Sequence, residues 1–121
     1  MIIQTDGLQK LPVLDASVID SLREIMEDDF HDLLETYLGD AVLRMRAIEE
    51  AARREDADAL RKAAHSFKGS SGNIGARQLS ELCRQVEEAA AQGKCPEVDA
   101  FFGVVQEAYG HVVQQIQVLM P

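Results

Sequence analysis

The chain has 121 residues, 46% of them apolar, so it is long enough to bury the hydrophobic core of one compact domain. Its 21 acidic and 12 basic residues give a net charge of −9, which argues against nucleic acid and anionic membranes as partners. No apolar run approaches the roughly 18 residues of a membrane span and no signal-peptide pattern opens the chain, so we expect a cytoplasmic protein.

The N-terminal part is predicted to contain an extended lead-in followed by a short helix. Residues 1–14 lack helical periodicity and include Pro12. Asp15 is a suitable N-cap, because its side chain can accept a hydrogen bond from a free N–H of the first turn. The apolar positions of the short helix are Val18, Ile19, Leu22, Ile25 and Met26. We expect this helix to cover one end of the fold.

A long helix is predicted to begin at Asp28 and Asp29. Its apolar residues recur at steps of three and four, which is the helical period. They are Phe30, Leu33, Leu34, Tyr37, Leu38, Ala41, Val42, Met45 and Ile48.

Three further helices follow the long one. The first of them is predicted to begin at Asp56 or Asp58, and Gly75 marks the turn that ends it. Gly93 is a suitable stop for the next helix, and Pro96 fits the first turn of the last. The inward-facing residues of the three helices are Leu60, Ala63, Ala64, Phe67, Ser71 and Ile74; Leu79, Leu82, Cys83, Val86 and Ala90; and Val98, Phe101, Phe102, Val105, Tyr109, Val112, Ile116 and Leu119.

No segment alternates with period two, and no β-branched cluster predicts a strand. Four amphipathic helices with short connections favour an all-α fold, an antiparallel up-down-up-down four-helix bundle over about residues 28–119. The short N-terminal helix is additional to this bundle. We expect residues 1–121 to form a single domain that is a monomer.

The stretch AHSFKGSSGNIGA, residues 64–76, places glycines inside a predicted helix, where each costs about 1 kcal/mol relative to alanine. With Leu60 as the zero of a helical wheel, His65 falls at about 140°, outside the apolar face. Gly69 and Gly72 lie on the C-terminal side of His65 and leave no side chain beside the imidazole. We therefore predict an exposed histidine that a bulky partner can approach closely.

The segment around this histidine is basic in an acidic chain. Residues 61–80 hold no Asp or Glu but contain Arg61, Lys62, Lys68 and Arg77. These cations can neutralise an anion placed on His65. The alternative is an ordinary exposed histidine on a helix that frays at its glycines, with cations that belong to a solvated face. His31 lies among acidic residues and His111 has no basic cluster, so we predict only surface or packing roles for both.

The stretch AHSFKGSSGNIGARQLSELCRQVE resembles the signature of histidine-containing phosphotransfer (HPt) domains. The residues that match the motif are His65, Lys68, Gly69, Gly75, Ala76 and Leu79. Upstream, LDASVIDSLREIMEDDFHDLLETYLGD resembles the opening helix and the start of the second helix of that family. The resemblance covers about residues 13–118, with no departure at the key positions.

The resemblance implies a phosphorelay intermediate, which accepts a phosphoryl group on His65 and exchanges it with an aspartate of a receiver domain. It implies a phosphocarrier without an ATP site, with no bound cofactor or metal, and with Mg²⁺ held by the partner. The implied partners are the receiver domain of a response regulator, a hybrid sensor histidine kinase, or both. A neutral imidazole is a good nitrogen nucleophile near neutral pH, which suits this chemistry.

The resemblance also suggests roles for neighbouring residues. Lys68 is expected to contact phosphoryl oxygens as a point charge, and Arg61 to assist from one turn before His65. Glu87 matches a family position near the histidine, where a side chain can orient the ring. The expected docking surface combines the small residues next to the histidine with apolar residues of the short first helix. Its members are Ser66, Gly69, Gly72, Val18, Ile19 and Leu22.

Two other classes of protein compete with this interpretation. A helical bundle adaptor would bind its signalling partner without phosphotransfer, and His65 would then be dispensable. A metal or haem bundle needs inward-facing ligands such as Glu-x-x-His pairs, which the sequence lacks. Cys83 and Cys95 fit no metal spacing, and Cys83 falls on an apolar helix face, where a free cysteine acts as a small hydrophobe.

Overall fold

The computed structural model describes residues 3–120, and all regular structure within them is helical. The elements in order are η1 (Leu8–Lys10), α1 (Ala16–Met26), η2 (Glu27–Asp29), α2 (Phe30–Arg53), α3 (Ala57–Asn73), α4 (Arg77–Ala91) and α5 (Val98–Leu119). The all-α prediction is therefore confirmed. The first two residues of the predicted lead-in, and Pro121 at the end of the predicted domain, lie outside the described residues.

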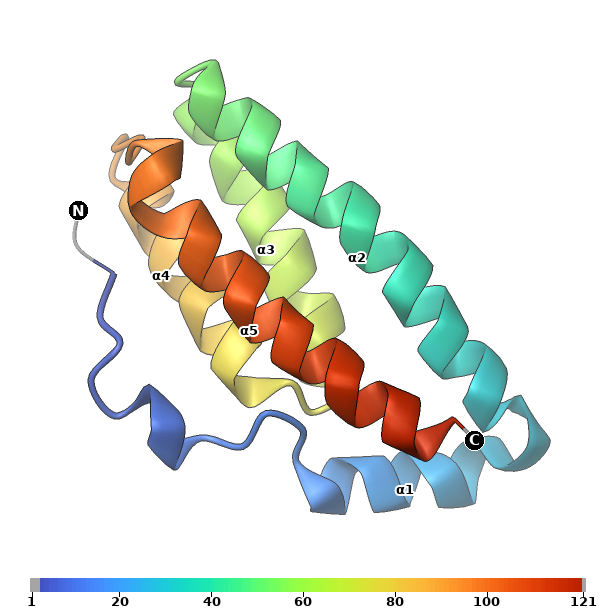
Figure 1. Cartoon of the computed structure of the whole chain (residues 1–121). Helices are drawn as coiled ribbons and strands as arrows, with labels where there is room; N and C mark the ends of the chain where they lie inside the picture. Colours follow the sequence, from blue (N-terminus) through green and yellow to red (C-terminus); the bar gives the residue numbers. More distant parts are fainter. Residues whose placement is uncertain (1–2, 121) are drawn as a thin grey trace.

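Helices α2 to α5 form the predicted up-down-up-down bundle (Figure 1). Helix α3 packs closely against both α2 and α4, and α5 closes the bundle by packing against the same two helices. The connections at residues 54–56, 74–76 and 92–97 are short, so consecutive helices run antiparallel. Helix α1 lies across the end of the bundle where α2 begins and α5 ends, which confirms its expected place.

Two aspartates cap the helices as their spacing predicts. The Asp15 carboxylate accepts a hydrogen bond from the Ser17 backbone N–H at 3.0 Å, at the start of α1. The Asp56 carboxylate accepts one from the Ala59 N–H at 3.0 Å, so Asp56 and not Asp58 begins α3. Each aspartate satisfies a backbone donor that the first helical turn leaves free.

The sequence prediction differs from the structure in the lead-in and before α5. The lead-in is not extended throughout, because η1 interrupts it after Gly7, whose φ of +79° turns the chain. Pro96 does not lie in the first turn of α5, which begins at Val98. Glu97 keeps an extended backbone, and Pro96 is buried in the loop before the helix.

Ile25 was predicted to face inward, but its exposed fraction is 75%. Helix α1 lies across the bundle end and buries only a narrow face, on which Ile19 is 5% exposed. Ile25 is about 240° round the helical wheel from Ile19, and so it faces away from the bundle. Val42 of α2, also predicted inward, is exposed as well.

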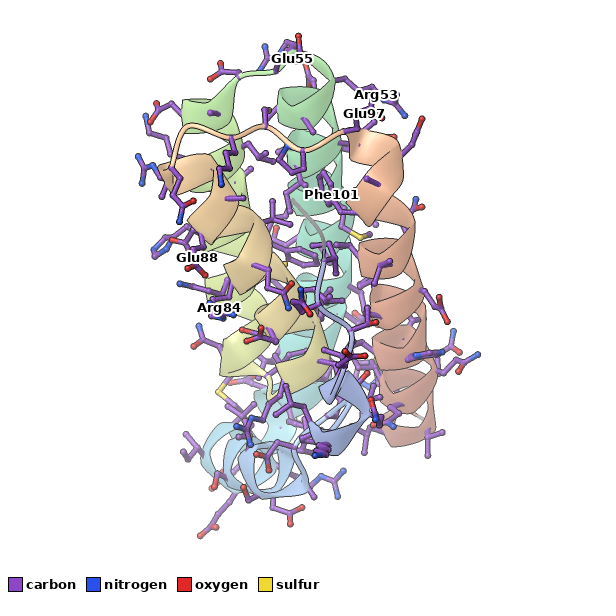
Figure 2. The ribbon with its side chains drawn as sticks, turned by 90° about the vertical axis from the view of Figure 1, so that its left-hand side faces the viewer. Arg53, Glu55, Arg84, Glu88, Glu97 and Phe101 are labelled. Atoms are coloured by element: carbon purple, nitrogen blue, oxygen red, sulfur yellow. The ribbon has the colours of Figure 1, made fainter. Side chains whose placement is uncertain are left out.

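The core runs the length of the bundle between the four helices. Its fully buried large side chains include Leu34, Ile48, Leu60, Phe67, Leu79, Leu82, Phe101 and Ile116. Figure 2 shows Phe101 directed into the bundle, whereas Arg53, Glu55 and Glu97 lie at the end that holds the α2–α3 and α4–α5 connections. Among residues 3–120, no helix is long and apolar enough to cross a membrane.

Among residues 3–120, one polar residue, Ser71, is buried in this core. The Ser71 hydroxyl of α3 has no exposed surface, and it lies 2.9 Å from the Tyr37 hydroxyl of α2. Burying a hydroxyl is costly unless it is hydrogen bonded, so the pair favours one register of α2 against α3. Ser71 lies on the core side of α3, less than two turns after His65.

Candidate functional site

His65 lies in the middle of α3, on the face that points away from the core. Its side chain is 66% exposed, which confirms the wheel prediction that it faces solvent. The other two histidines are also exposed, but their surroundings differ. His31 lies 3.1 Å from the Glu35 carboxylate, one turn along α2, which fits the surface role predicted for it.

The imidazole is held by a carboxylate from the neighbouring helix. Nδ1 of His65 lies 2.7 Å from Oε2 of Glu87, which α4 carries beside α3. The Glu87 side chain is 19% exposed, so the carboxylate is partly shielded from water. A carboxylate can only accept, so Nδ1 carries the proton of this hydrogen bond. The tautomer assigned in this way leaves the lone pair of the ring on Nε2.

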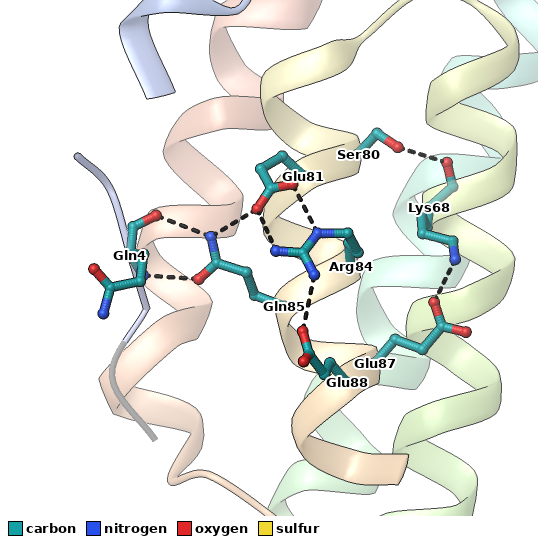
Figure 3. Close-up of polar contacts among 8 residues, drawn as sticks. All are labelled: Gln4, Lys68, Ser80, Glu81, Arg84, Gln85, Glu87 and Glu88. Atoms are coloured by element: carbon teal, nitrogen blue, oxygen red, sulfur yellow. Dashed lines mark hydrogen bonds and ion pairs between the residues drawn. The ribbon is translucent and has the colours of Figure 1, made fainter. Parts of the chain in front are cut away.

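Lys68 completes the cluster from one turn further along α3. Its Nζ lies 2.6 Å from Oε1 of Glu87, the carboxylate oxygen that does not face His65. Figure 3 shows the lysine reaching from α3 to Glu87 on α4. One carboxylate therefore binds both side chains, and we call His65, Lys68 and Glu87 the histidine cluster.

Two opposing effects set the ionisation of Glu87. Partial burial disfavours its charged form, but hydrogen bonds from Lys68 and His65, together with their positive charge, outweigh burial. The pKa of Glu87 is therefore lowered below the ordinary glutamate value. The carboxylate is anionic at neutral pH and remains available to stabilise positive charge on the imidazole.

The glycines next to the cluster leave the surface of α3 open. A Cβ built on Gly69 would meet no atom within 4 Å, so nothing in the fold requires a glycine there. A Cβ on Gly72 would lie 3.5 Å from the Ser80 Oγ, which is ordinary contact. Ser80 donates a hydrogen bond to the Lys68 carbonyl at 3.1 Å and so ties α4 to α3 beside the cluster.

Gly75 has a different reason for being glycine. Its φ is +80°, a conformation that residues with a side chain rarely adopt. A Cβ there would lie 3.0 Å from the Val18 Cβ and 3.2 Å from the Asp15 N. The Asp15 N–H donates to the Gly75 carbonyl at 2.8 Å. The α3–α4 turn thus docks directly on the start of α1.

Three other predicted residues lie near the cluster without joining it. The Arg61 guanidinium lies 3.1 Å from the Asp58 carboxylate, toward the N-terminus of α3 and away from His65. Ser66 is exposed beside His65, and its hydroxyl accepts a hydrogen bond from Arg44 of α2. Val18 lines a shallow groove that also includes Lys68, so it lies beside the cluster.

The remaining apolar residues predicted for docking belong mostly to the core. Ile19 is buried, so its prediction as a docking residue is wrong: it covers the end of the bundle instead. Leu22 is half-buried and packs on the same core. A helix that lies flat across a bundle end uses its apolar stripe for that contact, which leaves little of the stripe for a partner.

No pattern in the sequence predicts the contacts that hold the lead-in on α4. The Gln85 side chain accepts from the Gln4 N–H at 2.7 Å and donates to the Gln4 carbonyl at 2.9 Å. Arg84 of the same helix binds Glu81 and Glu88, each at 2.8 Å (Figure 3). Among residues 3–120, no group of three or more His, Cys, Asp or Glu side chains could hold a metal ion.

Comparison with known proteins agrees with this geometry. The family model described as the Hpt domain matches residues 32–117, which include all three residues of the histidine cluster. The chain belongs to the Hpt domain family. Among solved structures, it is similar to histidine-containing phosphotransfer protein B (HptB) from Pseudomonas aeruginosa PAO1, with 40% sequence identity and a TM-score of 0.80. That match covers 84% of this chain and 88% of HptB. No curated protein sequence matches the chain.

Membership in the Hpt family establishes the general function. The protein is a phosphorelay intermediate, which carries a phosphoryl group on a histidine and works with the receiver domains of phosphorelay partners. Hpt proteins are phosphocarriers and not enzymes in the usual sense.

Proposed function

We propose that His65 is the phospho-accepting histidine and that its Nε2 is the reacting atom. The observation that carries the proposal is the 2.7 Å hydrogen bond between Nδ1 and Glu87, which fixes the proton on the inner nitrogen and leaves the outer one free. The exposed position of the ring supports it, because the phosphoryl donor is a second protein. Neither His31 nor His111 lies in a comparable cluster of charges.

The transfer needs little chemistry from this chain. The Nε2 lone pair attacks the phosphorus of an aspartyl phosphate on the receiver, and an N–P bond forms as the P–O bond breaks. The electron pair of the broken bond leaves on the aspartate oxygen. Positive charge develops on the imidazole, and the Glu87 carboxylate stabilises it through the Nδ1 proton. In the reverse reaction that proton stays on Nδ1, so the ring leaves as neutral imidazole.

Lys68 is the cation that stabilises the phosphoryl group on His65. Lys68 lies one turn from His65 along α3, and its Nζ contacts the carboxylate that also binds the ring. Its flexible stem lets the Nζ swing from Glu87 toward a phosphoryl oxygen. Phosphoryl transfer depends mainly on positioning and on neutralising the charge of the phosphoryl oxygens. Arg61 contributes less to this stabilisation, because its guanidinium already pairs with Asp58.

The partner completes the active site. The receiver contributes Mg²⁺ and most of the catalytic groups, and this chain binds no cofactor of its own. The partner docks over Gly69, with Ser66, Gly72 and Val18 around it. A response regulator and a hybrid sensor histidine kinase can both supply such a receiver. The chain acts as a single, monomeric Hpt unit in the cytoplasm.

Incubation with phosphorylated receiver domains tests the proposal. Receivers encoded by the same genome are phosphorylated with acetyl phosphate and Mg²⁺ and then mixed with the protein. We expect the receiver to lose its phosphate and the protein to gain acid-labile phosphate, with a ³¹P NMR signal typical of Nε2-phosphohistidine. A stable complex without transfer would instead identify an adaptor, and a signal from Nδ1-phosphohistidine would overturn the assignment of the reacting atom.

A further inference from the structure

Arg44 stands at the edge of the surface that carries His65, although no sequence motif includes it. It lies on α2, and its guanidinium crosses to α3 and donates a hydrogen bond to the hydroxyl of Ser66, the residue next to the histidine. Asp40, one turn earlier on α2, is a weak second partner at 3.8 Å. The side chain is 33% exposed, so part of its charge faces solvent.

The hydrogen bonding of this guanidinium is incomplete. Nε of Arg44 is buried, and it finds no acceptor among the described residues. A buried donor without a partner raises the free energy of the arrangement that contains it. An acceptor supplied by another protein would satisfy this donor, which suits a residue that contacts a partner.

The positions around α3 place Arg44 and the histidine cluster on opposite sides of one face. On a wheel with Leu60 at zero, Gly69 points straight outward at about 180°, and Ser66 falls at about 240° on the α2 side. His65 and Lys68 fall on the α4 side, where they meet Glu87. A partner centred over Gly69 would thus contact the cluster with one edge and Arg44 with the other.

Charge favours an acidic partner at this edge. A receiver that presents a phospho-accepting aspartate and holds Mg²⁺ must carry several carboxylates around that site, because Mg²⁺ takes oxygen ligands. This chain has a net charge of −9, so most of its surface repels such a partner. The segment 61–80 departs from this acidity because it holds four cations and no Asp or Glu, and Arg44 extends its positive charge onto α2.

We propose that Arg44 is a specificity-determining contact for the receiver domain, pairing with a carboxylate on the receiver surface beside its phosphorylation site. The inference rests on the proposed function of His65. Arg44 takes no part in the bond making and breaking at phosphorus. It acts on encounter and docking, as charges at the rim of an interface do.

The experiment measures transfer from phosphorylated receivers to wild type and to Arg44→Gln, as kcat/KM over a range of NaCl concentrations. Arg46→Gln is the matched control, because Arg46 is exposed on the same helix and lies about 160° away from Arg44 round the wheel. We expect Arg44→Gln to lower kcat/KM about fivefold at low salt and to weaken its salt dependence. Arg46→Gln should stay near wild type, and Arg44→Lys should retain part of the rate.

A small-molecule donor separates docking from chemistry. Phosphoramidate phosphorylates histidine without a receiver, so its rate with Arg44→Gln should equal that of wild type. An equal loss of kcat/KM in Arg44→Gln and Arg46→Gln would mean that only net charge matters, and it would overturn the proposal. An unchanged kcat/KM in Arg44→Gln would overturn it too. A slower phosphoramidate reaction in Arg44→Gln would show that Arg44 supports the histidine site itself and not the docking of the receiver, which would also overturn the proposal. Failure of wild type to accept phosphate at all would instead refute the proposed function.

Discussion

Replacing Gly69 by glutamine separates access to His65 from the stability of α3. Gly69 lies inside α3 on its outward face, and a Cβ there meets nothing within 4 Å. Glutamine is a good helix former, so Gly69→Gln should leave the fold intact. Its side chain would nevertheless stand within one turn of His65, on the surface where a receiver must approach.

The expected magnitudes follow from the open space around Gly69. Gly69→Ala should raise the free energy of unfolding by up to about 1 kcal/mol, and Gly69→Gln by slightly less. For a chain of this size, 1 kcal/mol corresponds to a rise in Tm of about 4 °C. Transfer should fall at least tenfold in Gly69→Gln, because the longer side chain prevents close docking, whereas Gly69→Ala should lose much less.

Gly75 provides the structural contrast. Gly75→Ala combines a φ of +80° with a Cβ that lies 3.0 Å from the Val18 Cβ, so neither the backbone nor the space suits alanine. We expect it to lower the free energy of unfolding by about 3 kcal/mol, from the left-handed conformation and from overpacking together. The two glycines should thus give opposite changes in stability.

Thermal melts and a transfer assay on the same samples measure both quantities. We expect Gly69→Gln to be at least as stable as wild type and slow in transfer. If Gly69→Gln loses stability and transfer together, Gly69 serves the backbone or helix packing, and the argument from access is wrong. The phosphoramidate rate provides the control, since a small donor should still reach His65 in this variant.

Three further predictions concern the histidine cluster and the core beneath it. Lys68→Ala should slow transfer about tenfold or more while the bundle stays folded, and Lys68→Arg should be intermediate in a single-turnover assay. Full activity of Lys68→Ala would remove the lysine from the mechanism. The carboxylate of Glu87 has a lowered pKa, so its stabilising contribution is present above the ordinary glutamate range and is lost as the pH falls below about 4.3. Urea unfolding should therefore show a shallower acid loss of stability in Glu87→Gln than in wild type, and identical pH profiles would contradict the role given to its charge. Tyr37→Phe leaves the buried Ser71 hydroxyl without its partner and should lower the free energy of unfolding by about 1–2 kcal/mol in the same assay, while a change below about 0.5 kcal/mol would show that the pair contributes little.

Local patterns in the sequence predict much of this fold. Apolar residues recur every three or four positions along α2 to α5, because these positions share the helix face that meets the core. Most of the residues predicted from this spacing are buried in the structure. Asp15 and Asp56 cap backbone groups within three residues of themselves, and Gly75 supplies the positive φ of a local turn, so these roles are visible in the sequence. The contact of Gly75 with the start of α1 is not. The exposure of His65 follows from the same periodicity.

Features that depend on contacts between distant segments could not be predicted in this way. The wheel does not show that one Glu87 carboxylate binds two side chains of α3, and nothing near Arg44 in the sequence points to Ser66. Ile25 has the right spacing for burial, but the angle of α1 across the bundle end decides its exposure. The wrong prediction for Ile25 and the missed contacts of Glu87 and Arg44 share one cause: tertiary packing, and not local sequence pattern, determines them.

We expect His65 alone to carry the phosphoryl group, and three single variants distinguish it from the other two histidines. His65→Gln, His31→Gln and His111→Gln are each incubated with the same phosphorylated receiver, and acid-labile phosphate on the protein is measured against wild type. We expect all three variants to fold and only His65→Gln to accept no phosphate, because only His65 has Glu87 on Nδ1 and an open Nε2. Acid-labile phosphate on the folded His65→Gln variant would show that another residue carries the phosphoryl group.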